Sequence, residues 1–123
     1  MWDKRAQIKN IHDGDTLTVV LDQGFGDTKE IRLRLLGVFA PELKDNGGHE
    51  THEFVISWLS ARVSPSIGWP FVVTTARTKV SDKEVETLGR YVGTLTTLDG
   101  TDNLNVDVMQ FIRAKGYGGG TGS

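Results

Sequence analysis

The chain contains no cysteine, which excludes a disulfide framework, a thiolate zinc site and a cysteine nucleophile. No apolar run approaches the ~20 residues that a membrane span needs, so we expect no membrane partner. An excess of basic charge is also lacking: 14 Lys and Arg stand against 16 Asp and Glu, for a net charge of −2. That balance excludes a protein that holds nucleic acid mainly by bulk positive charge, but it permits an enzyme with a few well-placed arginines.

The 123 residues fit one domain, which is long enough to bury a core. We expect that domain over residues 1–116, followed by a disordered glycine-rich tail over residues 117–123. Residues 1–7 lack the apolar core of a secretory signal, so the chain as written is expected to be cytoplasmic. We expect a monomer.

Alternating and β-branched segments predict strands. In residues 29–38, Ile31 and Leu33 fall on one face, whereas Arg32 and Arg34 fall on the other. The pattern is typical of an antiparallel sheet with one face packed inward. The expected strands cover residues 6–11, 16–21, 29–38, 69–77 and 89–98, with a charged, exposed connector over residues 79–87.

Two helices complete the expected fold. Apolar residues at helical spacing predict one over residues 50–63, after the third strand. A short C-terminal helix is expected to begin at Asn105, acting as its cap, and to end at about residue 115. Together these elements predict a mainly β fold with helices (α+β), in which five strands form an OB-type barrel.

Oxygen-bearing side chains gather in the segment from Asp13 to Thr16. Two carboxylates, Asp13 and Asp15, with a hydroxyl beside them can ligate a hard cation such as Ca²⁺ or Mg²⁺. The alternative is that Asp13 only builds the Asp-Gly turn.

A second cluster follows the third expected strand. Arg34 can form a forked pair of hydrogen bonds to phosphate, and Glu42, just after the rigid Pro41, can orient or deprotonate a water. The alternative is that both are ordinary solvated charges. Arg90 follows Gly89 at the start of a strand, and it too is either a phosphate-binding residue or an ordinary solvated charge.

His49 and His52 lie three residues apart on the first expected helix. Ligation of a metal from one helical turn is possible in principle, but the spacing is not His-Glu-x-x-His and no third ligand is evident. We therefore interpret both as surface residues.

Three short motifs follow one another along the chain: Asp-Gly-Asp-Thr at 13–16, Arg-Leu-Leu-Gly-Val-Phe-Ala-Pro-Glu at 34–42 and Gly-Arg-Tyr at 89–91. In this order they resemble the staphylococcal nuclease (thermonuclease) family, and the resemblance runs from about residue 7 to residue 117. It implies an OB-fold barrel and calcium-dependent hydrolysis of DNA and RNA phosphodiesters that leaves 3′-phosphorylated products.

The resemblance also implies roles for single residues. Asp15 matches a calcium-binding carboxylate, and Ala40 matches the position whose backbone carbonyl ligates the ion. Glu42 matches the carboxylate that acts as general base or orients the attacking water. Arg34 and Arg90 match the two arginines that bind the phosphate.

The chain departs from the motif at Phe39, where the family has a second calcium-binding aspartate. Because calcium affinity depends on the number of charged ligands, we expect weak calcium binding, with Asp13 as a substitute ligand. Thr87 and Leu88 also replace a Lys-Tyr pair that the family often carries. Two hypotheses follow: a calcium-dependent nuclease weakened by Phe39, or a catalytically impaired module that binds nucleic acid or protein.

Overall fold

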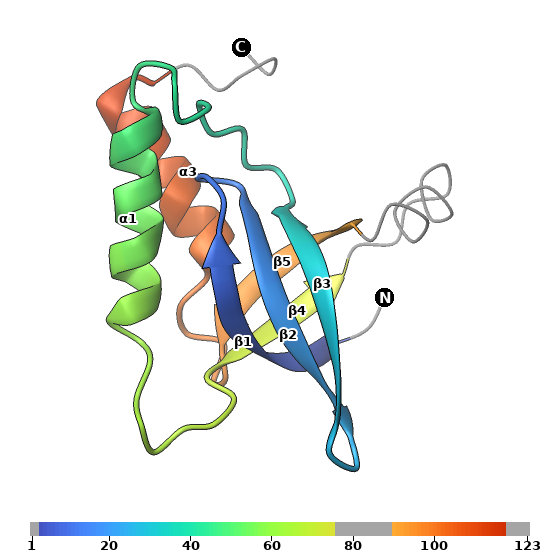
Figure 1. Cartoon of the computed structure of the whole chain (residues 1–123). Helices are drawn as coiled ribbons and strands as arrows, with labels where there is room; N and C mark the ends of the chain where they lie inside the picture. Colours follow the sequence, from blue (N-terminus) through green and yellow to red (C-terminus); the bar gives the residue numbers. More distant parts are fainter. Residues whose placement is uncertain (1–2, 76–89, 118–123) are drawn as a thin grey trace.

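Five strands close into a barrel in the computed structural model, which describes residues 3–75 and 90–117 (Figure 1). Their order around the barrel is β1-β2-β3-β5-β4, and every neighbouring pair is antiparallel except β3 and β5. This closed barrel with two helices confirms the predicted α+β, OB-like fold. The strands are β1 (Asp3–Ile11), β2 (Thr16–Gly24), β3 (Asp27–Leu35), β4 (Phe71–Thr75) and β5 (Arg90–Thr97).

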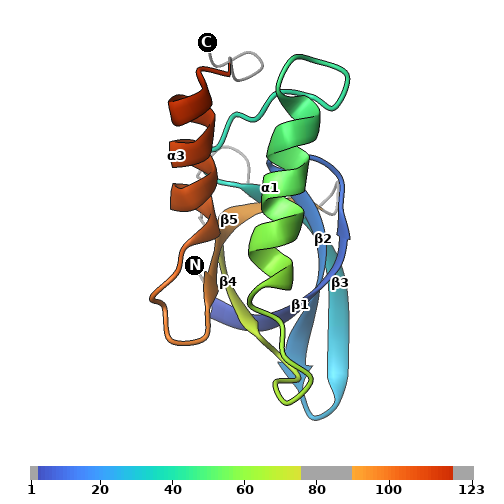
Figure 2. The same cartoon turned by 90° about the vertical axis from the view of Figure 1, so that its left-hand side faces the viewer.

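Two helices pack side by side against the barrel: α1 (Gly48–Ser60), which follows β3, and α3 (Leu104–Lys115), which follows β5. Figure 2 shows α1 lying across one opening of the barrel, beside α3. Both helices supply core residues, including Val55 and Val108, which are fully buried. Across the described ranges, neither helix combines the length and apolarity that a membrane crossing requires.

The barrel interior follows the two-residue period of β2 and β3. Leu17, Val19 and Leu33 are completely buried, whereas Arg32 and Arg34 face solvent, as the alternation predicts. Each fully buried leucine side chain of this kind contributes roughly 2 kcal/mol. Because the residues that alternate with Arg32 and Arg34 are packed in the core, the backbone that carries these two arginines is held rigidly in place.

Strand boundaries differ from the prediction where the backbone turns. β3 ends at Leu35, not at residue 38, because the chain reverses at Gly37, whose φ is 77°. β4 begins at Phe71, after Pro70, and β2 continues to Gly24. The predicted end of the fourth strand at residue 77 and the connector over 79–87 lie outside the described residues.

Asn105 does not cap the C-terminal helix. The cap is Asn103, whose side chain accepts a hydrogen bond from the Val106 N–H at 3.2 Å. Asn105 is buried, accepts from the Leu95 N–H and donates to the carbonyls of Leu36 and Gly93. It therefore ties α3 to β5 and to the residue that follows β3.

Tyr117, the residue at which the sequence places the start of the tail, packs against the domain. Its ring lies 6.1 Å from that of Phe111, and its hydroxyl donates to Glu50 at 3.2 Å. The ring also covers Gly47, where a Cβ would meet ring atoms at 2.4 Å. The glycine-rich residues 118–123 lie outside the described residues.

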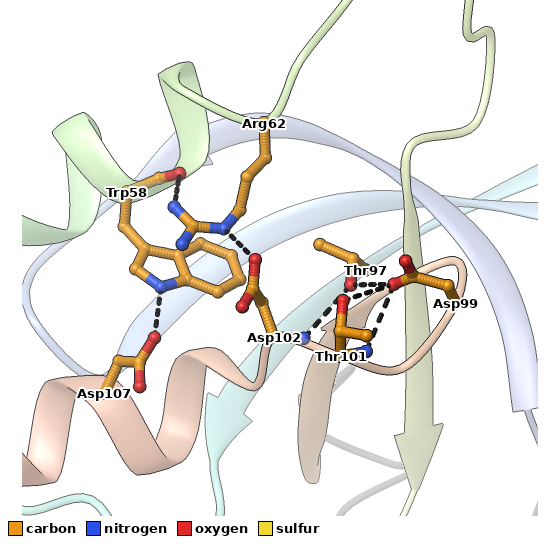
Figure 3. Close-up of polar contacts among 7 residues, drawn as sticks. All are labelled: Trp58, Arg62, Thr97, Asp99, Thr101, Asp102 and Asp107. Carbon is orange, nitrogen blue, oxygen red and sulfur yellow. Dashed lines mark hydrogen bonds and ion pairs between the residues drawn. The ribbon is translucent and has the colours of Figure 1, made fainter.

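A polar network joins the C-terminal end of α1 to the start of α3 (Figure 3). The Trp58 indole N–H donates to Asp107 at 2.7 Å, and Arg62, stacked 3.9 Å over the Trp58 ring, donates to Asp102 at 3.0 Å. In the turn before α3, Asp99 accepts hydrogen bonds from both Thr97 and Thr101, and these bonds lower its pKa to about 2. The network is structural and lies away from the candidate site.

Candidate active site

Asp15 lies in the turn between β1 and β2, with its carboxylate largely buried. The residue is 7 % exposed; its Oδ1 accepts from the Thr16 hydroxyl at 3.0 Å and its Oδ2 from the Ala40 N–H at 3.2 Å. Asp13 does build the turn, because its Oδ1 accepts the Asp15 N–H at 3.0 Å. Between them, Gly14 has no room for a side chain: a Cβ would lie 2.7 Å from that of Ala40. The turn and the loop after β3 are therefore pressed together.

Arg34 extends from the outer face of β3 toward this turn. Its Nη2 lies 3.8 Å from Asp15 Oδ2 and donates a long hydrogen bond of 3.5 Å to the Val38 carbonyl. The guanidinium also lies 5.8 Å from the centre of the Phe39 ring, within cation–π range. Because these partners hold it only loosely, the exposed guanidinium can still bind an anion.

Glu42 combines a fixed backbone with an exposed side chain. Its carbonyl accepts the Asp45 N–H at 2.9 Å, and the start of α1 packs so closely that a Cβ on Gly48 would fall 1.8 Å from that oxygen. Its carboxylate contacts only Lys44 among the described residues, in an exposed ion pair of 3.6 Å. A glutamate anchored in this way presents a solvated carboxylate that can act on water.

A single pocket of about 560 Å³ brings most of the predicted site together. The sequence motifs did not single out Lys44 and Asp45, which enter the pocket only because the chain turns back after Glu42. Five predicted site residues meet here although two separate chain segments supply them. The lining residues are Asp13, Asp15, Thr16, Arg34, Phe39, Ala40, Glu42, Lys44 and Asp45.

Arg90 is placed through its backbone alone. It begins β5, and the parallel register pairs it with Arg32, while Arg34 is paired with Val92. The residue therefore begins the strand next to the one that carries Arg34. Contact between its side chain and the pocket stays a prediction.

The prediction that both histidines are surface residues holds for His49 but not for His52, which is half-buried. His49 is exposed, and His52 donates from Nε2 to the Ile11 carbonyl at 2.9 Å. Within residues 3–75 and 90–117, no group of three or more histidine, aspartate or glutamate side chains is arranged to hold a metal. A cation at Asp15 would therefore depend on additional ligands from backbone carbonyls, hydroxyls or water.

The pKa of Asp15 is raised from its ordinary value of 3.8 to about 6, mainly by burial and also by the neighbouring Asp13 carboxyl. The Arg34 guanidinium and the Ala40 N–H oppose this rise. The surroundings of Asp15 therefore stabilise its ionised carboxylate less well than water does. A bound cation would supply the missing compensation, and the carboxylates, hydroxyl and backbone oxygens nearby are the ligands that Ca²⁺ prefers. The oxygen donors present therefore fit a hard cation such as Ca²⁺ in their chemistry.

Asp15→Asn is expected to raise the free energy of unfolding in metal-free buffer near neutral pH by up to about 2 kcal/mol, after discounting for solvent screening. The folded state binds the Asp15 proton more tightly than the unfolded chain, so the wild type loses stability as the pH rises from about 4 to about 6. The neutral asparagine does not titrate. Denaturant unfolding of both proteins across this range measures the difference, which should grow with pH; a constant difference would contradict the raised pKa.

The sequence has no match among protein-family models or among curated proteins. The fold and the pocket define a small OB-like barrel protein with a buried carboxyl, an exposed arginine and an exposed glutamate at one site. Membership in the nuclease family is therefore a proposal that rests on the three motifs.

Proposed function

We propose that this protein is a metal-dependent nuclease of the staphylococcal nuclease type, acting on DNA or RNA with calcium as cofactor. The observation that carries the proposal is the pocket that gathers Asp15, Arg34 and Glu42. A buried carboxyl with a raised pKa, a loosely held guanidinium and a solvated carboxylate suit the hydrolysis of a phosphodiester.

In this mechanism Arg34 and Arg90 bind the non-bridging oxygens of the phosphate and stabilise the negative charge that grows on them in the transition state. Glu42 orients the attacking water and accepts its proton. Its exposed side chain and anchored backbone suit that role, since the carboxylate can reach a water without disturbing the fold.

Asp15 and the Ala40 carbonyl would hold the calcium ion, with Asp13 and Thr16 nearby as further oxygen donors. When bound, the ion would act as a Lewis acid that neutralises charge on the phosphate. Asp15 must be ionised to serve as a ligand, so its raised pKa makes calcium affinity fall as the pH drops below about 6.

The proposal is tested by incubating a labelled DNA strand with the protein in Ca²⁺ or in chelator and analysing the ends of the products. We expect cleavage only with Ca²⁺, and fragments ending in 3′-phosphates. Absence of cleavage at any calcium concentration, from protein whose circular dichroism shows it folded, would contradict the nuclease function.

Phe39 favours the second candidate function, a catalytically impaired module that binds nucleic acid or protein. This aromatic side chain is 45 % exposed and lines the pocket at the position where the motif has an aspartate. It supplies no oxygen to a cation. Binding of DNA without cleavage in the same assay would support the module.

Phe39→Asp is expected to bind Ca²⁺ about ten- to a hundredfold more tightly than the wild type, because it adds a charged ligand beside Asp15. The same change should lower the melting temperature without metal, since a third carboxylate joins Asp13 and Asp15 and the contact with Arg34 is lost. Calorimetric titration of both proteins with Ca²⁺ measures the affinities. Equal affinities would show that position 39 does not reach the cation, and tight binding by the wild type would contradict the weak site.

A further inference from the structure

A second cavity, of about 270 Å³, adjoins the candidate active site on the outer face of β2 and β3. Asp13, Thr16 and Arg34 line both cavities, so the two form one continuous surface. The second cavity is completed by His12 and Arg32, which the nuclease motifs do not include.

Arg32 is exposed on the same face of β3 as Arg34, two residues earlier in the strand. With the usual rise of a strand, their backbones are separated by about 6.6 Å. That distance is comparable with the spacing of successive phosphates along an extended nucleic-acid strand. Two guanidiniums on one rigid strand can therefore bind neighbouring phosphates.

The charge of the second cavity favours an anion. Over the described part of the chain, no ion pair or hydrogen bond holds the Arg32 side chain, whereas Arg34 is partly neutralised by Asp15. Asp13 is the one carboxylate in the lining, and its Oδ1 already accepts the Asp15 N–H. Two arginines thus face a single carboxylate that is engaged in the turn.

His12 forms the fixed wall of the cavity. Its Nε2 hydrogen-bonds with the Thr18 hydroxyl at 2.7 Å, and Thr18 is the register partner of Arg32 across β2 and β3. The ring is therefore held beside the strand that presents Arg32. A cavity with a fixed ring on one side and a guanidinium on another can bind a phosphate, because the guanidinium can donate paired hydrogen bonds to two phosphate oxygens.

We infer that the cavity lined by His12, Asp13, Thr16, Arg32 and Arg34 binds the phosphate adjacent to the scissile one. This inference rests on the proposed function and narrows its substrate to a polynucleotide strand with at least two successive phosphates. Contacts to phosphate carry no base information, so the subsite adds affinity without sequence preference.

The test uses the full chain in chelator, where cleavage does not interfere. Thymidine dinucleotide has one phosphate and the trinucleotide has two; NMR titration compares their affinities for the wild type, Arg32→Ala and Arg5→Ala. Arg5 is exposed on β1 and lines neither cavity, so it is the matched control. We expect the wild type and Arg5→Ala to bind the trinucleotide about tenfold more tightly than the dinucleotide, and Arg32→Ala to bind both equally.

Salt dependence gives a second readout with a thymidine dodecanucleotide. Loss of one phosphate contact should lower the slope of log affinity against log salt by about 0.7 in Arg32→Ala, and leave it unchanged in Arg5→Ala. Arg32→Lys should restore the slope, because it keeps the charge, but regain only part of the affinity, because it lacks the planar fork.

Three results would each overturn the inference. Arg32→Ala could lose the same factor of affinity for the dinucleotide as for the trinucleotide, or it could bind both as Arg5→Ala does. The third result is a wild type that binds no oligonucleotide. Hydrolysis by a wild type whose Arg32→Ala variant binds normally would overturn the subsite and leave the nuclease function intact. Binding as expected without hydrolysis in Ca²⁺ would overturn the nuclease function and leave the subsite.

Discussion

Arg34→Ala is expected to lower kcat for DNA hydrolysis by about 10²–10³-fold, because removing one preorganised donor to a developing anion typically costs that much. The structure places the guanidinium 3.8 Å from Asp15 and on the wall of the pocket that also holds Glu42. Steady-state kinetics with a labelled oligonucleotide in saturating Ca²⁺ measures the effect. The loss should appear in kcat more than in KM, since the contact strengthens as charge builds on the phosphate.

The fold should tolerate this change. Arg34 is exposed, its hydrogen bond to the Val38 carbonyl is long, and its ion pair with Asp15 is partly solvated. We therefore expect circular dichroism close to that of the wild type and only a small change in melting temperature. Arg5→Ala, on β1, is the control for loss of a surface charge and should cleave normally. Normal cleavage by folded Arg34→Ala would remove Arg34 from the mechanism.

Glu42→Gln is expected to reduce kcat by about 10²–10⁴-fold, the usual contribution of a positioned acid or base. Glutamine keeps the size and the hydrogen-bonding capacity of the side chain but cannot accept a proton at neutral pH. Because the carboxylate is exposed and pairs only with Lys44 among the described residues, its replacement should barely change stability. Rates and unfolding curves of the purified variant give both quantities.

Asp45→Asn provides the matched control for Glu42→Gln. Asp45 lines the same pocket, is exposed, and loses the same charge in that substitution, but no catalytic role follows from the motif. Its rate should stay within a few-fold of the wild type. If both variants lose activity equally, the effect reflects the charge of the pocket. If Glu42→Gln unfolds while its folded fraction cleaves normally, Glu42 has a structural role.

The strands and their faces could be predicted because local alternation reports burial directly. Leu17, Leu33 and Arg34 lie where the two-residue period places them. The sequence predicted the fold class but not the order of the strands around the barrel, because the parallel pairing of β3 with β5 joins segments far apart in the chain. The cap at Asn103 was missed because Asn105 carries the same local signal, and only the packing of α3 shows that its side chain enters the core.

The sequence predicts which residues form the candidate site, but not how deeply each side chain is buried or which residues surround it. The motifs containing Asp15 and Glu42 were recognised, and the structure brings them to one pocket. The burial of Asp15 depends on the approach of Ala40, from a loop 25 positions later in the chain, so it could not be read locally. The second cavity was missed for the same reason: Arg32 gave only the signal of a solvated strand residue, and His12 gave none.

The central claim is that a cation held at Asp15 serves phosphodiester hydrolysis in this pocket. The most direct measurement is the rate of DNA cleavage by the wild type and by Asp15→Asn, followed side by side as Ca²⁺ is added from zero. We predict that the wild-type rate rises from background and saturates at high calcium, as expected for a weak site, while the variant stays near background. A wild-type rate that does not depend on Ca²⁺, or a variant that responds to Ca²⁺ as the wild type does, would contradict the account.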